Sequence, residues 1–116
     1  MVGVVSDVLI LAREEVVAAL LGLMVELRGL QPRFLGKAES IQDAIGCLSF
    51  YAVVIDCDHP DCTSQLLDTV RITGVLPILF SPSRTQSEVR EVAERHGLRS
   101  FALPTDPETF GRMLEA

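Results

Sequence analysis

Asp56 is the residue of this sequence that is best placed to do chemistry. It follows an unbroken apolar run at residues 51–55, which is rich in β-branched side chains. The run shows no polar alternation, so both of its faces should be covered, as in a central strand of a parallel sheet with helices on both sides. Ligands of such sheets bind at the carboxyl ends of the strands. Asp56 should therefore lie at the functional edge.

A second kind of chemistry is suggested by the residues that follow. Cys57, His59 and Cys62 bring thiol and imidazole groups close to Asp58 along the chain. Zinc sites usually combine two such clusters, and the other histidine, His96, is far away in sequence. We therefore expect no metal or redox site here, and interpret Cys57 as a small buried residue and His59 as a loop residue.

Length and composition are those of a single domain spanning residues 1–116. Hydrophobic residues make up 48% of the chain and charged residues 22%, which is enough apolar material for a real core. The formal net charge is −6, and no basic stripe is visible. Binding to nucleic acid or to an anionic membrane surface is therefore not expected, and the partners should be proteins.

The cysteines and the N-terminus favour a cytoplasmic location. There are three cysteines, an odd number without a disulfide framework. The first residues lack the basic start of a signal peptide. The longest apolar run, within residues 16–27, is short and contains Glu26, so it is not a membrane span.

Strands and helices are expected to alternate five times. Apolar runs predict strands at residues 8–11, 33–36, 53–56, 75–80 and 100–103, and helical spacing predicts helices over about 14–28, 40–48, 62–72, 85–96 and 105–114. Thr85 and Glu88 have the spacing of a capping box, and Thr105 and Glu108 repeat it. Right-handed crossovers would then give an α/β fold with a doubly wound parallel sheet.

The first helix is apolar on more than one face. Its inward stripe is predicted to consist of Val17, Leu20, Leu21, Met24 and Leu27. Val16, Ala19 and Leu23 add apolar positions outside that stripe. A helix that is apolar nearly all round is buried or makes a contact. A partner, a second copy or further residues of a longer chain would cover it, and we expect a weak homodimer through the first and last helices.

Five β-α units in this length, with an aspartate ending the third strand, resemble the receiver domain of bacterial two-component response regulators. The resemblance covers nearly the whole chain. It implies a flavodoxin-like (βα)5 sheet of strand order 2-1-3-4-5. It also implies a site made of an acidic pair after the first strand, a phosphoaccepting aspartate after the third, a hydroxyl after the fourth and Lys-Pro after the fifth.

Three positions match this implied site. The phosphoacceptor falls on Asp56, and the proline that the family has four residues later matches Pro60. The switch hydroxyl falls on Ser81, directly after the fourth apolar run. The proline of the Lys-Pro pair falls on Pro104, which in this family follows a cis peptide bond.

Three other positions have lost the required group. The acidic pair falls on Ala12 and Arg13, and the lysine falls on Leu103. In this family Mg²⁺ bridges the acceptor and the phosphoryl group, and Mg²⁺ takes carboxylate ligands. Ala12 offers no ligand, Arg13 places a cation where a cation should bind, and Leu103 cannot pair with phosphoryl oxygens. The resemblance therefore implies a degenerate site without a cofactor.

Several interpretations of the neighbouring residues remain open. Arg13 would either pair with Asp56 or extend into solvent. Glu14 or Glu15 would act as a replacement metal ligand, or more simply as a solvated acid in the first helical turn. Asp58 is a substitute acceptor or, as we favour, a loop acid. Ser81 either hydrogen-bonds within the site or belongs to a turn.

The function that the resemblance implies is a receiver-like signal-transduction module of the phosphorelay type, and not an enzyme. It would act by protein contact through the fourth helix, fifth strand and fifth helix, with a histidine kinase or an output domain as partner. It would stand alone or form the N-terminal part of a longer regulator. The alternative is a competent receiver, phosphorylated on Asp56 with Mg²⁺ bound. A flavodoxin-like enzyme or nucleotide binder is disfavoured, because no glycine-rich loop follows the first strand.

Overall fold

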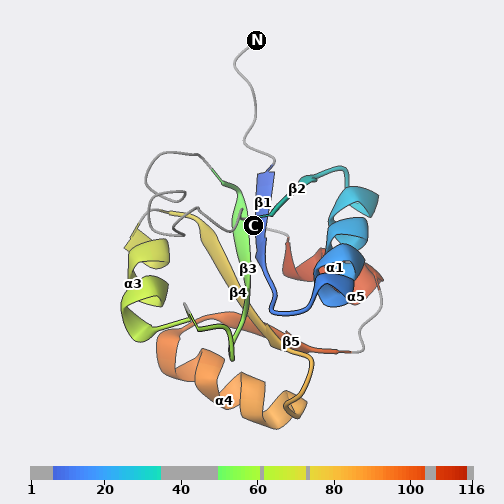
Figure 1. The fold of residues 1–116 in the computed structure, drawn as a ribbon. Coiled ribbons are helices and arrows are strands. Elements are labelled where there is room, and N and C mark those ends of the chain that lie inside the picture. The colour runs from blue at the N-terminus through green and yellow to red at the C-terminus, as the bar shows by residue number, and fades with distance from the viewer. Residues whose placement is uncertain (1–6, 35–49, 61, 73, 104–106, 115–116) are drawn as a thin grey trace.

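The chain forms a five-stranded parallel sheet covered by helices on both faces (Figure 1). The structure, a computed structural model, describes residues 7–34, 50–60, 62–72, 74–103 and 107–114. Within these ranges the elements are β1 Asp7–Leu11, α1 Glu15–Leu27, β2 Gln31–Phe34, β3 Ala52–Asp56, α3 Ser64–Ile72, β4 Leu76–Ser81, α4 Gln86–His96, β5 Arg99–Ala102 and α5 Pro107–Met113. The strand order is β2-β1-β3-β4-β5, which confirms the expected flavodoxin-like topology.

The central strands divide their side chains between two cores. In β1 and β3, Val8, Ile10 and Val54 point toward the layer that contains α1 and α5. Leu9 and Ile55 point toward the opposite layer, which contains α3 and α4. Because successive side chains of a strand face opposite sides of the sheet, an unbroken apolar run is what two covered faces require. Figure 1 shows the two helical layers on either side of the strands.

Every strand differs from the sequence-based expectation by one or two residues at an end, and β2 differs most. β2 covers Gln31–Phe34 rather than residues 33–36, so Pro32 lies inside the strand, opposite Val8, instead of in the loop before it. β2 is an edge strand, where a missing backbone N–H is tolerated. β5 covers Arg99–Ala102, one residue earlier than expected. Residues 35 and 36 and the predicted second helix, residues 40–48, lie outside the described ranges.

The predicted inward stripe of α1 is wrong at two positions. Leu20 is 47% exposed and Leu27 is 63% exposed. The buried residues are instead Leu21, Gly22, Met24 and Val25. Gly22 faces β2 closely: a Cβ added there would lie 3.0 Å from Cζ of Phe34. Because ten consecutive residues of α1 carry no charge, residues 16–25, periodicity alone could not select the buried face.

The later helices largely follow their expected limits. The capping box at Thr85 and Glu88 is present, and α4 ends at His96 with Gly97 as its C-cap in the left-handed conformation. α3 begins at Ser64 rather than at residue 62, because the Thr63 hydroxyl accepts a hydrogen bond from the Leu66 amide and caps the helix. In α5, Phe110 is buried as expected, while the predicted cap residue Thr105 lies outside the described ranges.

Aromatic and hydrogen-bond contacts attach the end of the chain around α5 to the sheet, among them a hydrogen bond from Arg99 of β5 to the backbone carbonyl of Met113. Phe110 meets the ring of Phe101 edge-on, and Phe101 in turn stacks on Phe80 of β4. The Tyr51 hydroxyl, just before β3, donates a hydrogen bond to the backbone carbonyl of Leu114. Among the described helices, none combines the length and the apolar character that crossing a membrane would need.

Candidate functional site

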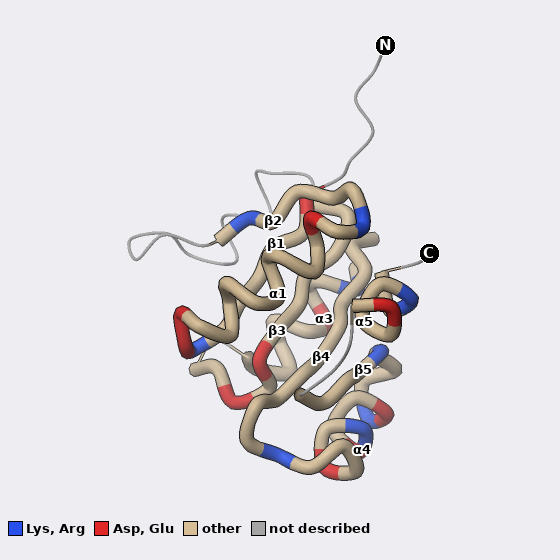
Figure 2. The backbone as a smooth tube through the Cα atoms, turned by 90° about the vertical axis from the view of Figure 1, so that its right-hand side faces the viewer, with Lys and Arg blue, Asp and Glu red and all other residues tan. Residues whose placement is uncertain are grey.

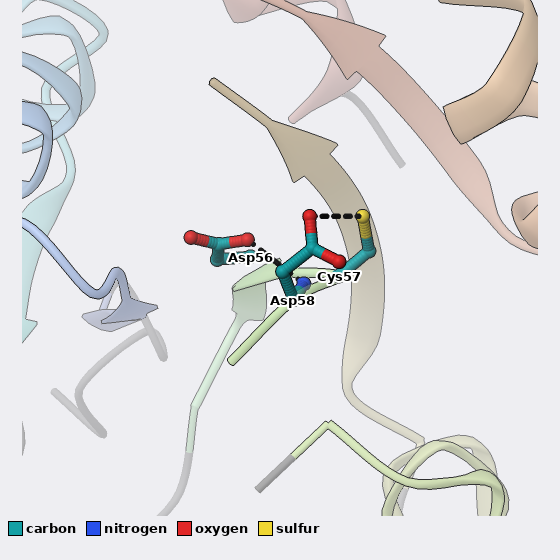
Figure 3. Close-up of side chains that lie close together, drawn as sticks. All are labelled: Asp56, Cys57 and Asp58. Atoms are coloured by element: carbon teal, nitrogen blue, oxygen red, sulfur yellow. Dashed lines mark hydrogen bonds between the residues drawn. The ribbon is translucent and has the colours of Figure 1, made fainter. Parts of the chain in front are cut away.

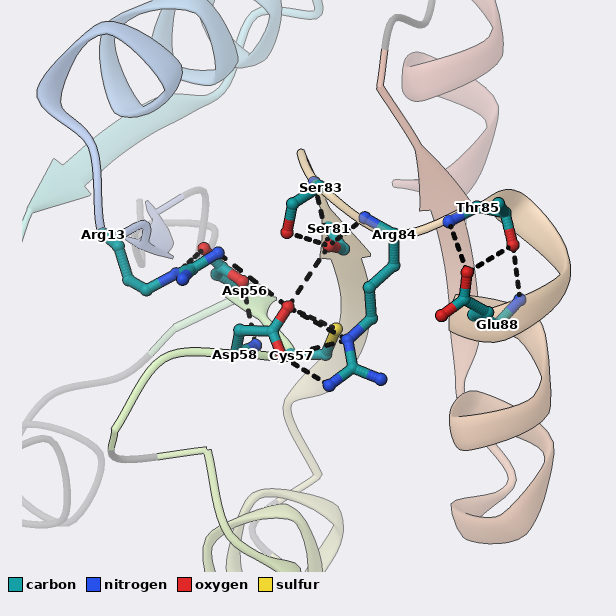
Figure 4. Close-up of polar contacts among 9 residues, drawn as sticks. All are labelled: Arg13, Asp56, Cys57, Asp58, Ser81, Ser83, Arg84, Thr85 and Glu88. Carbon is teal, nitrogen blue, oxygen red and sulfur yellow. Dashed lines mark hydrogen bonds and ion pairs between the residues drawn. The ribbon is translucent and has the colours of Figure 1, made fainter.

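The carboxyl ends of β1, β3 and β4 bring the candidate residues together (Figure 4). Asp56 is the last residue of β3 and lies opposite Phe80 of β4 in the register. Ser81 directly follows Phe80 and ends β4. Arg13 lies in the loop after β1, whose last residue, Leu11, is opposite Ile55. A parallel register therefore places three residues that are far apart in sequence at one edge of the sheet.

The Asp56 carboxylate is buried and both of its oxygens are engaged. Its side chain is 1% exposed. Oδ2 accepts a hydrogen bond of 2.8 Å from Nε of Arg13, and Oδ1 accepts one of 2.9 Å from the backbone amide of Asp58. The pairing of Arg13 with Asp56, one of the two interpretations of Arg13, is therefore present. The contact raises the pKa of the Arg13 guanidinium, so the positive charge is permanent.

Asp58 is held by a second arginine, which sequence reasoning missed. Nε of Arg84 lies 3.0 Å from both carboxylate oxygens of Asp58, and Nη2 lies 2.7 Å from Oδ1. Nη2 of Arg13 is 3.8 Å from Oδ2 of the same carboxylate. The hydrogen bonds from Arg84 lower the pKa of Asp58 and raise that of Arg84. The position of Arg84, just beyond the end of β4, was the signal that could have identified it.

These four residues form a chain of alternating charge, Asp56–Arg13–Asp58–Arg84, which we call the charge chain. Figure 4 shows its members pointing toward one another from the ends of three strands. Two carboxylates and two guanidinium groups make it formally neutral. A buried carboxylate is stable when it is paired and hydrogen-bonded, and both conditions hold for Asp56. The site is thus electrostatically complete without an added cation.

Ser81 joins the charge chain to the loop after β4. Its buried hydroxyl oxygen accepts hydrogen bonds from the backbone amides of Ser83, at 3.2 Å, and Arg84, at 3.0 Å. Its hydroxyl also lies 3.5 Å from Oδ2 of Asp58, to which it donates. Both interpretations of Ser81 therefore apply, since the residue organises a turn and contacts the site.

The donor set at this edge does not suit a metal ion. Among the described residues, a group of potential ligand atoms is formed by Asp56, Cys57 and Asp58, which lie within 4.8 Å of one another (Figure 3). Both carboxylates are already bound by arginines. Burial raises the pKa of the Cys57 thiol, so the thiolate that a metal would need is disfavoured. Mg²⁺, which requires oxygen ligands, finds no unpaired carboxylate among these three residues.

The other predicted site residues lie as follows. Ala12 and Leu103 are partly buried and pack against the core on the α1 and α5 side. Glu14 and Glu15 are exposed at the start of α1, as solvated acids would be. Pro104 and its expected cis peptide bond lie outside the described ranges.

The cysteine and histidine cluster does not assemble as a site in the described residues. His59 and Cys62 are not part of the ligand group formed by Asp56, Cys57 and Asp58. The His59 amide closes a turn onto the backbone carbonyl of Asp56. Burial raises the pKa of the Cys62 thiol to about 11, so it stays protonated at neutral pH. Cys57 and Cys62 are both half-buried and pack against the core on the α3 and α4 side. Cys57 is therefore less buried than expected, and its thiol also donates a weak hydrogen bond to the Asp58 carboxylate.

Comparison with known proteins gives matches in structure but not in sequence. No protein-family model and no curated protein sequence matches the chain. A response regulator receiver domain protein from Methanospirillum hungatei JF-1 has a TM-score of 0.73 at 17% identity, over 96% of this chain and 94% of that one. The receiver domain of a sensor histidine kinase from Pseudomonas aeruginosa PAO1, with a magnesium ion coordinated in its active-site cleft, has a TM-score of 0.75 at 17% identity, over 96% and 95%.

A third similar structure is a response regulator from Burkholderia pseudomallei that carries a phosphorylated aspartic acid and a calcium ion. It has a TM-score of 0.75 at 16% identity, over 96% of this chain and 67% of that one. The similarity extends over nearly the whole chain in all three comparisons, although few residues are identical. This chain therefore has the flavodoxin-like fold of response-regulator receiver domains.

Proposed function

We propose that this protein is a receiver-like signalling module that works by protein contact, without phosphorylation of Asp56. The observation that supports this most directly is the 2.8 Å contact between Nε of Arg13 and Oδ2 of Asp56. With Oδ1 also hydrogen-bonded, neither oxygen of this carboxylate is left as an uncommitted nucleophile. Arg13 would supply the positive charge beside Asp56 that a competent receiver obtains from a bound metal ion.

Phosphoryl transfer to Asp56 would need groups that this chain lacks. The transferred group brings negative oxygens toward the carboxylate, and fixed positive charge must stabilise them. Arg13 is committed to Asp56, and Leu103, at the position of the family lysine, is apolar and partly buried. Losing such stabilising groups typically raises the barrier by several kcal/mol.

The charge chain also connects the site to the surface proposed for partner binding. Arg84, its last member, immediately precedes Thr85, the N-cap residue of α4. The ion pair between Arg84 and Asp58 thus fixes the start of α4 relative to the end of β3. We propose that α4, β5 and α5 form the partner surface and that the charge chain holds it in one state. The partner would be a cytoplasmic protein, either an output domain or a histidine kinase.

The competent receiver is the alternative, and one feature favours it. Asp56 and Ser81 lie at the ends of adjacent paired strands, as a phosphoacceptor and a switch hydroxyl would. In that case Arg13 would have to leave Asp56 before a metal ion could bind. The two proposals therefore differ in how the unmodified protein responds to Mg²⁺.

Titration with Mg²⁺, followed by amide chemical shifts in NMR spectra, separates the two proposals. Our proposal predicts no saturable shifts at residues 12–15 and 56–58 at millimolar Mg²⁺, because Arg13 already neutralises Asp56. Saturable, localised shifts would instead favour the competent receiver.

A restored variant provides the matched positive control. Ala12→Asp with Arg13→Asp and Leu103→Lys would return the acids and the lysine, and it should show saturable Mg²⁺ shifts at the same residues. Because Leu103 packs against a core, circular dichroism must first show that the variant is folded. If the folded variant binds no Mg²⁺ either, the missing acids and lysine do not explain the behaviour of the parent protein.

A further inference from the structure

The solvent-facing side of α1 carries an apolar stripe that no other described helix shows. Val16, Leu20, Leu23 and Leu27 follow one another at spacings of four, three and four residues. Their side chains are 80%, 47%, 56% and 63% exposed, respectively. We call these four residues the α1 stripe. At 3.6 residues per turn this spacing keeps them on one narrow strip along the helix.

The stripe contrasts with the exposed side of α4, which serves as an internal comparison. The exposed positions of α4 include Arg90, Glu91, Glu94 and Arg95, and an ion pair joins Glu91 to Arg95. In α1, charge is confined to the ends: Glu15 lies in the first turn and Glu26 near the last, with no charged residue between them. Figure 2 shows the same pattern, with acidic colour at the two ends of α1 and none along its middle.

Spacings of four, three and four residues are those by which a helix packs along its length against another helix. A second copy of the same stripe provides a matching surface, because the pattern reads the same from either end of the helix. A two-fold symmetric contact requires such a self-complementary patch. The geometry points to α1 as a dimerisation helix, with α1 of a second copy of this chain packed along the stripe.

The helix dipoles favour an antiparallel arrangement of the two helices. A parallel pair would align the two dipoles side by side, whereas an antiparallel pair sets the positive start of each helix beside the negative end of the other. In this arrangement Val16 lies near Leu27 of the second copy, and Leu20 near Leu23.

The size of the stripe limits the strength of the contact. A helix of 13 residues is about 20 Å long, so the pair buries much less than the roughly 800 Å² per partner of a standard stable interface. The dimer should therefore be weak and depend on protein concentration. The inference does not depend on the state of Asp56, because the stripe and the charge chain share no residue.

Sedimentation equilibrium of the full chain, from micromolar to millimolar concentration, tests the inference. We expect a reversible monomer–dimer equilibrium, and Leu23→Glu should weaken association by at least about tenfold. Ile72→Glu is the matched control, since Ile72 of α3 is 85% exposed and lies outside the stripe, and it should leave the equilibrium unchanged. A strict monomer at millimolar concentration, or equal effects of the two substitutions in folded protein, would overturn the inference.

Disulfide trapping tests the orientation. After mild oxidation, a mixture of Val16→Cys and Leu27→Cys chains should form covalent dimers well above the background of the parent protein. Each variant alone should stay at that background. Efficient trapping of Val16→Cys with itself would overturn the antiparallel arrangement.

Discussion

At the scale of single residues, the contact between Arg13 and Asp56 is the feature on which the proposed function depends. Asp56 lies at the end of β3, where the resemblance places a phosphoacceptor, yet its carboxylate is buried against Arg13. A buried carboxylate needs a positive partner, which is normally a metal ion or a basic side chain. Here a permanent guanidinium group fills that role.

The ion pair between Asp58 and Arg84 should make stability depend on pH. The pKa of Asp58 is lowered in the folded protein, mainly by hydrogen bonds from Arg84, below an unfolded value of about 3.9. Its contribution to stability is therefore complete above about pH 5 and is lost as the pH falls below about 4. Asp58→Asn should lower the free energy of unfolding by up to about 1 kcal/mol at pH 7, and by less at pH 3.

Urea denaturation at both pH values measures this difference. Asp68→Asn is the matched control, since Asp68 is exposed on α3, and its effect should be small and the same at both pH values. An Asp58→Asn effect that stayed constant or grew at low pH would contradict the assignment of this ion pair.

At the level of elements, the start of α4 connects the candidate site to the proposed partner surface. The capping box at Thr85 and Glu88 fixes the helix locally, and Arg84 attaches that cap to the loop after β3. Arg84 of the charge chain and Thr85, the N-cap of α4, are adjacent in the sequence. A change in the ion pair of Arg84 should therefore alter the position of the first turn of α4.

Arg84→Ala should therefore act at a distance. We expect amide shift changes both at residues 57–59 and in the first turn of α4, with only a small loss of stability, because an exposed ion pair is screened by solvent. Arg95→Ala is the matched control, because it removes an exposed arginine from an ion pair on the same helix. Its shift changes should stay near Glu91, with a cost of about 0.3–0.5 kcal/mol. Changes confined to α4 in both variants would show that Arg84 does not link α4 to the site.

The elements that could be read from the sequence are those with one strong local signal. The apolar run of β3 predicted a central strand, and the capping box predicted the start of α4. The buried face of α1 was misjudged, because every face of that helix is apolar and tertiary contacts made the choice. The limits of β2 were misjudged because the strand includes Pro32, which an edge strand accepts although a proline has no backbone N–H to donate.

The site was predictable in position but not in all its contacts. Parallel topology places Asp56, Ser81 and Arg13 at one edge, and this follows from the order of the strands. The contact between Arg84 and Asp58 depends on the path of the loop after β4, which carries no periodic pattern. The spacing of Cys57, His59 and Cys62 in the sequence also raised the possibility of a cluster. In the structure the His59 amide closes a turn onto Asp56, and both cysteines pack against the core.

At the scale of the whole molecule, the chain has the fold of response-regulator receiver domains. Its similarity in structure extends to a receiver domain with a magnesium ion and to a response regulator with a phosphorylated aspartic acid. We propose that the charge chain closes the carboxyl edge of the sheet in this protein. The central claim is therefore that the unmodified protein does not accept a phosphoryl group at Asp56.

Intact mass after incubation with acetyl phosphate and Mg²⁺ tests this claim most directly. The account predicts that the mass of the parent protein stays unchanged, because Arg13 holds Asp56 and no second acid binds the metal ion. The folded variant with Ala12→Asp, Arg13→Asp and Leu103→Lys should gain the mass of one phosphoryl group in part of the population. Ready phosphorylation of the parent protein, abolished by Asp56→Asn, would contradict the account and establish the competent receiver.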